Sequence, residues 1–120
     1  MIIAVAFGAF GAHALKTMLD EDRMQIWKTA SDYHFYHALG LITLGVWSEK
    51  TTLTVFTKAA GICLIMGVMI FSGSLYGLAI SDIRQLGMLT PIGGLLFIAG
   101  WILWLLSLLM KSDAPWSLSD

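Results

Sequence analysis

A chain of 120 residues has room for one domain at most. Hydrophobic residues make up 58% of it and charged residues only 12%, half the ~25% that is typical of soluble domains, so too little polar surface remains for a water-soluble shell. The net charge of −1 argues against nucleic-acid binding, because phosphate contacts need clustered Lys and Arg. Cys63 is the single cysteine, which excludes an intramolecular disulfide.

The first fifteen residues are apolar except for His13. As a helix they would reach about 22 Å, short of the ~30 Å hydrocarbon core of a bilayer. They have neither the basic start nor the cleavage site of a signal peptide, so we expect a first transmembrane helix whose beginning is missing. Small residues would form one edge of this helix, where a neighbouring backbone can approach. These residues are Ala4, Gly8, Gly11 and Ala12.

Most of the charged residues lie between Lys16 and Lys28. Asp20 is in position to cap the N-terminus of a helix, and two acidic residues follow it in the first turn, where the helix dipole favours them. Apolar residues then recur three and four positions apart, which is typical of an amphipathic helix at the lipid headgroups. We therefore expect a short interfacial amphipathic helix between the first and second transmembrane helices, with Trp27 as its aromatic anchor.

A second crossing is predicted over residues 33–47, as a continuation of the interfacial helix. It is the weakest of the four predicted crossings, because its first turn contains Asp32, His34 and His37. Ionisable side chains inside a membrane are costly and usually find partners. A short polar loop or helix cap over residues 51–57 would follow.

Two longer apolar segments come next. Residues 59–80 contain no Asp, Glu, Lys, Arg or His and would form a helix about 33 Å long, enough to cross the hydrocarbon core. Residues 88–110 are equally free of charge. Small residues and a proline in the first turn of the last segment should let these helices pack closely where they are connected. They are Gly73 and Gly77 in a GxxxG pair, followed by Pro91, Gly93 and Gly94.

The sequence therefore predicts an all-α protein, a four-helix transmembrane bundle. Residues 1–112 would form this single membrane domain, and residues 113–120 a polar tail. Lys and Arg divide four to three between the two sides of such a bundle, so the positive-inside rule does not decide its orientation.

Four motifs follow one another along the chain: GAFGAHALK at residues 8–16, WKTASDYHFYHALGL at 27–41, FSGSLY at 71–76 and TPIGG at 90–94. In this order they resemble the YgdD-like small inner-membrane proteins of bacteria, a family of unknown function with distant eukaryotic relatives. The resemblance covers nearly the whole chain. It implies a four-helix protein of the inner membrane, and it implies no catalytic residue.

A polar cluster is predicted where the first two helices meet. In an antiparallel hairpin, a histidine near the end of the first helix would lie at a depth similar to that of the histidines near the start of the second. The cluster comprises His13, Asp32, Tyr33, His34 and His37. One hypothesis is structural: His13, Tyr33 and His37 would form a hydrogen-bonded clasp between helices, of a kind that averages ~0.6 kcal/mol per bond in membranes. Lys28 and Asp32, four residues apart, would form an ion pair beside it.

Two other hypotheses assign a function to the same cluster. A histidine from each of two helices could ligate haem, noncovalently because the chain has no CxxCH motif. Alternatively, Asp32 could exchange protons with a histidine in a small transporter or proton relay. A zinc site made of His13, His37 and Asp32 matches no known ligand spacing.

The glycine-rich segments are open to two interpretations as well. They would either let the last two helices close tightly or form a shallow slot for a lipid tail or a partner helix. The expected function is non-enzymatic, without a cofactor or metal. We expect a structural, regulatory or accessory subunit of the cell (inner) membrane, multi-pass, whose partners are the lipid bilayer and a second copy or another membrane protein.

Overall fold

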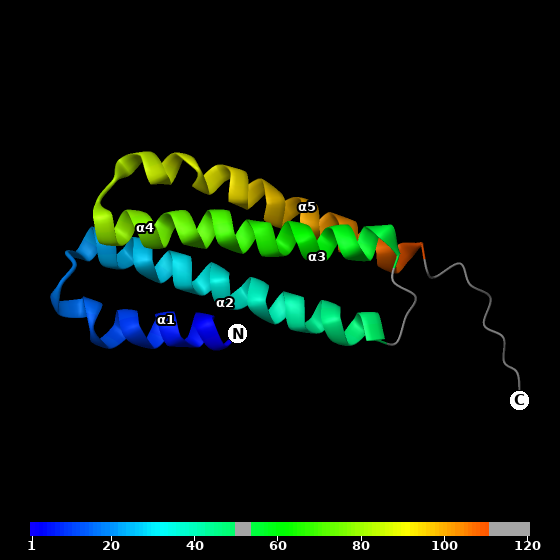
Figure 1. Cartoon of the computed structure of the whole chain (residues 1–120), viewed down its shortest axis with the longest axis horizontal. Coiled ribbons are helices and arrows are strands. Elements are labelled where there is room, and N and C mark those ends of the chain that lie inside the picture. Colours follow the sequence, from blue (N-terminus) through cyan, green and yellow to red (C-terminus); the bar gives the residue numbers. More distant parts are fainter. Residues whose placement is uncertain (50–53, 111–120) are drawn as a thin grey trace, which may run out of the picture.

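A computed structural model of the chain describes residues 1–49 and 54–110. Every regular element in these residues is helical, which confirms the predicted all-α class. The helices form four rods that lie side by side with their long axes nearly parallel (Figure 1). In chain order they are α1 (Ile2–His13), α2 (Glu21–Glu49), α3 (Val55–Gly67), α4 (Gly73–Ser81) and α5 (Thr90–Leu109), with α3 and α4 in one rod. The predicted polar tail, residues 113–120, lies outside the described residues.

The chain passes from α1 to α2 through a 3-10 turn, Leu15–Thr17. Asp20 caps α2 as predicted, since its Oδ1 accepts a hydrogen bond of 2.9 Å from the Arg23 N–H. The predicted continuation of the interfacial helix into the second crossing is confirmed, because α2 runs without a break over 29 residues, and the interfacial segment is therefore not a separate element. No Gly or Pro interrupts the sequence of α2 before Gly40, so its charged first turns and its apolar later turns form one helix.

The third rod begins inside the predicted polar loop. Thr54 caps it, because the Thr54 Oγ1 accepts a hydrogen bond of 3.1 Å from the Thr57 N–H. A π-helical turn, Val68–Ser72, joins α3 to α4 without ending the rod. Asp82 then adopts a left-handed backbone (φ 57°), which ends the rod and turns the chain towards α5. A further 3-10 turn, Arg84–Met88, precedes α5.

Two of the four rods are long and apolar enough to cross a membrane: Val55–Ser81, with 27 residues, and Arg84–Leu109, with 26. They contain the predicted charge-free segment 59–80 and all but the last residue of 88–110, and Pro91 lies in the first turn of α5 as expected. Ile2–Thr17 is a shorter apolar helix. The fold thus has the four predicted rods, two of which have the length and composition of transmembrane helices.

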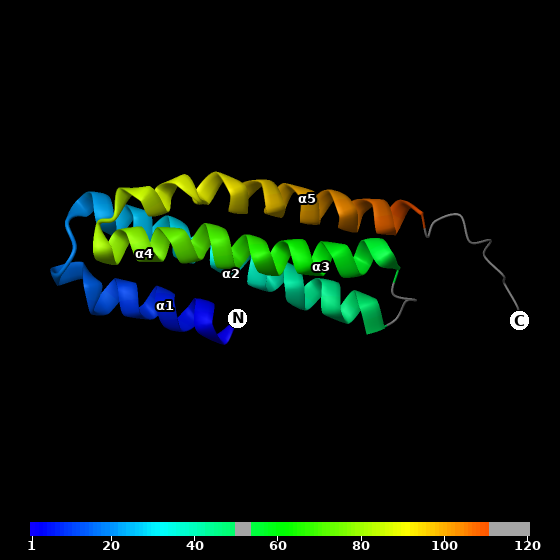
Figure 2. The same ribbon diagram turned by 45° about the horizontal axis from the view of Figure 1, so that its top comes forward.

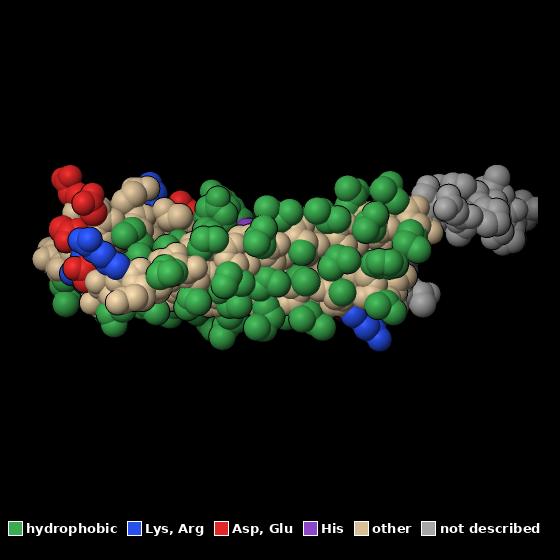
Figure 3. Space-filling model, turned by 90° about the horizontal axis from the view of Figure 1, so that it is seen from above, with side chains coloured by type: hydrophobic (Ala, Val, Ile, Leu, Met, Phe, Trp, Pro, Cys, Tyr) green, Lys and Arg blue, Asp and Glu red, His purple; other side chains and the backbone are tan. Residues whose placement is uncertain are grey.

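Charged side chains gather at the end of the molecule where α1 joins α2. The space-filling view shows Lys, Arg, Asp and Glu side chains concentrated there, followed by a long stretch of hydrophobic surface (Figure 3). The two views of the ribbon show that α1 runs beside only part of α2, starting at the charged end (Figures 1 and 2). The rest of α2 extends beyond α1 towards the far end of the bundle.

α1 packs on α2 through its small residues. Ala4 and Gly11 are buried, and a Cβ on Gly11 would overlap the indole of Trp27. Trp27 is only 4% exposed, and its Nε1 donates a hydrogen bond of 3.1 Å to Phe7 O. Trp27 is therefore a core residue between α1 and α2, and the predicted role as an interfacial anchor is wrong, because the glycine opposite leaves room for the indole.

The rod of α3 and α4 packs closely on α5, also through glycines. A Cβ on Gly93 would lie 2.7 Å from Phe71 Cα, and one on Gly100 would lie 2.8 Å from Leu64 Cδ2. These contacts agree with the prediction that the last two helices pack through small residues. Gly73 does not make the predicted contact, because a Cβ there would meet no atom within 4 Å.

The remaining predicted glycines face side chains rather than backbone. A Cβ on Gly77 would lie 2.9 Å from Leu86 Cδ1, in the turn that connects the last two rods, and one on Gly94 would lie 3.9 Å from the Phe71 ring. The GxxxG pair is thus not where another helix comes closest. On α1, a Cβ on Gly8 would lie 3.2 Å from Ser31 Oγ.

The start of α2 is tied to the end of α4. The Arg23 Nε donates a hydrogen bond of 2.7 Å to Ala79 O, and its Nη2 donates to Ile80 O. These carbonyls belong to the last turn of α4, where helix carbonyls lack partners and the helix dipole favours a positive charge. Arg23 therefore fixes both helices at the charged end of the bundle.

Candidate functional site

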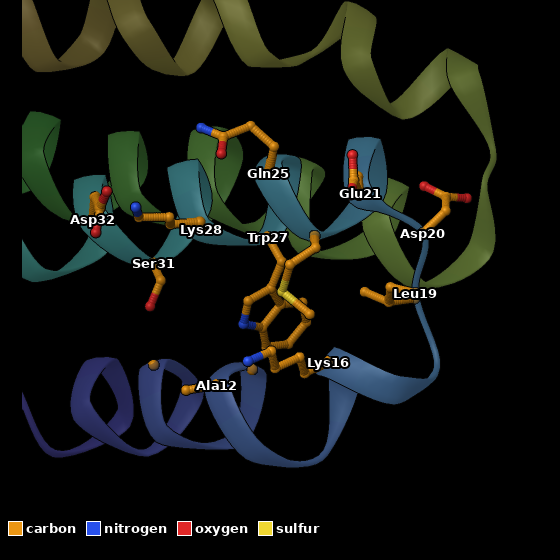
Figure 4. A pocket seen from close by; sticks show the side chains of 13 residues that line it. Ala12, Lys16, Leu19, Asp20, Glu21, Gln25, Trp27, Lys28, Ser31 and Asp32 are labelled. Atoms are coloured by element: carbon orange, nitrogen blue, oxygen red, sulfur yellow. The ribbon is translucent and has the colours of Figure 1, made fainter.

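A cavity of about 570 Å³ lies between α1 and the first turns of α2. Charged side chains form its rim and apolar side chains its interior, as at the interface between lipid headgroups and acyl chains. We therefore call it the interfacial cavity. Trp27 and Ser31 point into it from α2 towards α1 (Figure 4). Lys16, Asp20, Glu21, Lys28 and Asp32 supply the charges of the rim. Such a change from charged to apolar lining is what the boundary between headgroups and acyl chains offers a membrane protein.

Lys28 and Asp32 both line the interfacial cavity, but the described residues do not include an ion pair between them. The predicted ion pair is therefore absent. Both side chains are exposed at this rim, where an ion pair contributes little to stability.

His34 joins three helices. Its Nδ1 lies 3.4 Å from the hydroxyl of Tyr76 on α4, and its ring centroid lies 6.4 Å from that of Phe7 on α1. Phe7 and Tyr76 pack edge to face, with their centroids 4.9 Å apart. Tyr76 also contacts Trp27, at 4.5 Å between centroids. These four rings hold α1, α2 and α4 together at the charged half of the bundle.

His37 faces a different neighbour, α5. Its ring lies parallel to that of Phe97, with centroids 3.4 Å apart and an angle of 11° between the planes. Its Nδ1 lies 2.7 Å from Tyr33 O in the preceding turn of α2. The side chain is only 7% exposed. Tyr33 in turn stacks on Phe71, at 4.5 Å and 29°, while the Phe71 ring is tilted by 53° from that of Phe97, so a cluster of four rings joins α2 to the α4–α5 side.

These rings border a second cavity, of about 580 Å³, between α2 and α5. We call it the aromatic groove. Its lining includes Tyr33, His37, Phe71, Gly94, Phe97 and Trp101. From α5, Pro91, Leu95 and Ile98 also line it, and Gly94 adds no side chain to this wall.

The structure does not bring the predicted polar cluster together. The antiparallel packing of α1 on α2 sets Gly11 opposite Trp27 and Gly8 opposite Ser31, so His13 lies beyond Trp27 towards the start of α2. His13 is exposed and makes no hydrogen bond or ring contact with the other described residues. The predicted clasp of His13 with Tyr33 and His37 does not form.

The physical reason is the starting point of α2. Because that helix begins at Glu21, His34 lies about 20 Å along it, well away from the connection to α1. Asp32 is exposed at the rim of the interfacial cavity, so it does not face His37 either. The three residues considered for zinc remain apart, and the described residues do not contain a group of three potential metal ligands.

Two residues that organise the site were not identified as site residues from the sequence. Tyr76 is the partner of His34, and Phe97 is the partner of His37. Tyr76 is the one tyrosine in the predicted third crossing, and that polar group in an apolar segment was a usable signal. Phe97 gave no such signal, because an apolar ring in an apolar helix is the ordinary case.

The fold and its surface define a class of protein before any comparison. An all-helical bundle with charges at one end and two charge-free rods of membrane-spanning length is a small helical membrane protein. The family model described as "Protein of unknown function (DUF423)" matches residues 7–94, and the chain belongs to this family. The match confirms the expected membership in a bacterial membrane-protein family of unknown function.

Curated relatives carry the designation UPF0382 rather than the YgdD name. A UPF0382 membrane protein of Staphylococcus haemolyticus is 51% identical over 106 residues, which cover 88% of this chain and 85% of the relative. The UPF0382 membrane protein YwdK of Bacillus subtilis is 41% identical over 102 residues, covering 85% of this chain and 83% of that protein. No solved structure matches the chain.

Proposed function

We propose that this chain is a non-enzymatic protein of the cell (inner) membrane that crosses the bilayer four times and acts as a structural or accessory subunit. The distribution of charge supports the four crossings. The Asp and Arg residues of α2 lie in its first half, and its later turns expose large apolar side chains. These exposed residues include Phe35, Leu39, Ile42 and Val46.

One observation carries the accessory role. α1 covers only the charged half of the bundle, and beyond it α2 and α3 leave a cavity of about 440 Å³ between them. We call this cavity the helix slot. Its apolar lining includes Leu41, Leu44, Gly45, Gly61, Ile62 and Ile65. The slot lies between rods that run side by side, so another helix could lie along it.

The lining of the helix slot suits a helix from another membrane protein. A Cβ on Gly45 would meet no atom within 4 Å, and one on Gly61 would meet only Leu44, at 3.5 Å. Small residues that face outward let a second backbone approach closely, which is how helices associate in lipid. Lys58 is the charged residue among those lining the slot, near the start of α3.

Site-specific photo-crosslinking in the native membrane tests this role. A benzoylphenylalanine placed at Ile62, inside the helix slot, should give a protein adduct of one defined mass. The same group at Ile102, an exposed position of α5 outside the slot, is the matched control and should not give this adduct. The mass of the adduct separates a second copy of this chain from a different protein.

A blocking variant makes the test sharper. Gly45→Trp fills the helix slot without an internal clash, because Gly45 faces open space. It should abolish the adduct at residue 62 while leaving the protein folded, as judged by circular dichroism. Equal adducts at residues 62 and 102, or none at residue 62, would contradict the accessory role.

The alternative functions find less support in the geometry. A haem-binding bundle or a proton relay built on His13, His34 and His37 needs at least two of these side chains to face each other. His34 instead contacts Tyr76 and Phe7, while His37 stacks on α5.

A further inference from the structure

The tautomer of His37 follows from its hydrogen bond. Its Nδ1 lies 2.7 Å from Tyr33 O, and a carbonyl oxygen can only accept a hydrogen bond. The Nδ1 therefore carries a proton and donates. In the neutral ring, the Nε2 then keeps its lone pair and is a hydrogen-bond acceptor.

This acceptor has no protein partner. The Nε2 of His37 makes no hydrogen bond within residues 1–49 and 54–110, although the side chain is only 7% exposed. His37 lines the aromatic groove, whose other walls are mainly apolar. A polar atom left without a partner in such surroundings costs free energy, so the groove has an unmet demand for a hydrogen-bond donor.

The shape of the aromatic groove favours a flat ring. His37 and Phe97 lie face to face, and Tyr33 is inclined by only 17° to His37 and 27° to Phe97. Tyr33 and Trp101 are each 41% exposed at the groove, so their rings are available to a ligand. A planar ring that enters the groove can join this stack.

The charge of the aromatic groove indicates a neutral ligand. None of the described residues that line it carries a net charge when His37 is neutral. Haem would bring two propionates and a phospholipid headgroup would bring a phosphate, and neither anion would find a cation there. A volume of about 580 Å³ is within the usual range for sites that bind small molecules.

We infer that the aromatic groove binds a membrane-soluble hydroquinone, whose hydroxyl donates a hydrogen bond to the Nε2 of His37 while its ring stacks on Tyr33 and packs at an angle against Trp101. The ligand is neutral, flat, soluble in the membrane and carries the donor that His37 lacks. This site adds a ligand to the proposed accessory role. It depends on α2 and α5 lying in the bilayer and not on what occupies the helix slot, so the two proposals can fail separately.

The test compares two probes on the purified full chain in lipid nanodiscs, by anaerobic titration calorimetry against empty nanodiscs. Decylhydroquinone has the donor, and its dimethyl ether keeps the ring and tail without the donor. The wild type should bind decylhydroquinone about tenfold more tightly than the ether. In His37→Phe, which keeps a ring to stack on Phe97, the two probes should bind equally.

A variant that fills the groove tests its location. Gly94→Leu places a larger side chain in the groove, and its Cβ would make only ordinary contact with Phe71, at 3.9 Å. It should abolish binding of both probes, whereas Gly45→Ala, outside the groove, should bind like the wild type. Equal binding of the two probes to the wild type, or full binding by Gly94→Leu, would overturn the inference. Both measurements remain possible even if His37→Phe does not fold.

Discussion

Gly11 shows how a single residue sets the packing of α1. Its Cα faces the Trp27 indole so closely that a methyl group would overlap it. Because Trp27 is buried and hydrogen-bonded to Phe7 O, the indole has little freedom to move. Gly11 is therefore the residue that allows Trp27 to belong to the core.

Replacing Gly11 by Ala should lower the free energy of unfolding by about 1–3 kcal/mol, the usual cost of overpacking a core. Thermal unfolding in detergent, followed by tryptophan fluorescence, measures the change. Gly45→Ala is the matched control, because a Cβ at Gly45 meets no atom within 4 Å. A Gly11→Ala protein as stable as the control would show that α1 does not pack on α2 as described.

Neighbouring glycines of α5 show the same effect between helices. A Cβ on Gly93 would overlap the Phe71 backbone, which cannot turn away as a side chain can, whereas one on Gly94 would only touch the Phe71 ring at 3.9 Å. Gly93→Ala should therefore lower the free energy of unfolding by ~2 kcal/mol or more, and Gly94→Ala by far less. Chemical denaturation of the two variants, compared with the wild type, gives both values. Equal losses would contradict the close approach of α5 at Phe71.

At the scale of the element, Arg23 holds the start of α2 against the end of α4. Its guanidinium donates to Ala79 O and Ile80 O at the end of α4. Since the side chain is only partly buried, Arg23→Gln should cost about 1–2 kcal/mol. Amide hydrogen exchange should show faster opening in the last turn of α4 and an unchanged rate in α5. An unchanged rate at both places would mean that the cap does not stabilise α4.

The sequence predicts elements better than it predicts their register. Residues 59–80 and 88–110 are free of charge, and backbone groups in lipid can be satisfied only within a helix, so length and composition were enough to predict these two rods. The contact between α1 and α2 depends instead on Gly11, which leaves room for the indole of Trp27. The spacing of residues on one helix shows which of them share a face, but it does not show which residues of another helix they meet.

The histidines show the consequence of that limit. Sequence spacing placed Tyr33 and His37 on one face, and they do lie there, with His37 Nδ1 bonded to Tyr33 O. The partners of His34 and His37, which are Tyr76 and Phe97, could not be predicted in this way. Each lies more than 40 residues away in the chain, on a rod whose rotation about its own axis does not follow from the sequence.

At the scale of the whole molecule, most of the charge visible in Figure 3 lies at one end, and the apolar rods extend away from it. The connections between α1 and α2 and between α4 and α5 meet at this end. The far end carries the end of α2 and the start of α3. A bilayer around the apolar region would therefore separate Asp20 and Asp82, on one side, from Glu49 on the other.

Labelling with a membrane-impermeant thiol reagent tests this arrangement most directly. In a Cys63→Ala background, single cysteines at Asp20, Asp82 and Glu49 are exposed in turn on intact cells and on inverted membrane vesicles. Asp20→Cys and Asp82→Cys should react from the same side, and Glu49→Cys should react only from the opposite side. Labelling of all three positions from one side would contradict the crossing of α2 and with it the four-helix membrane bundle.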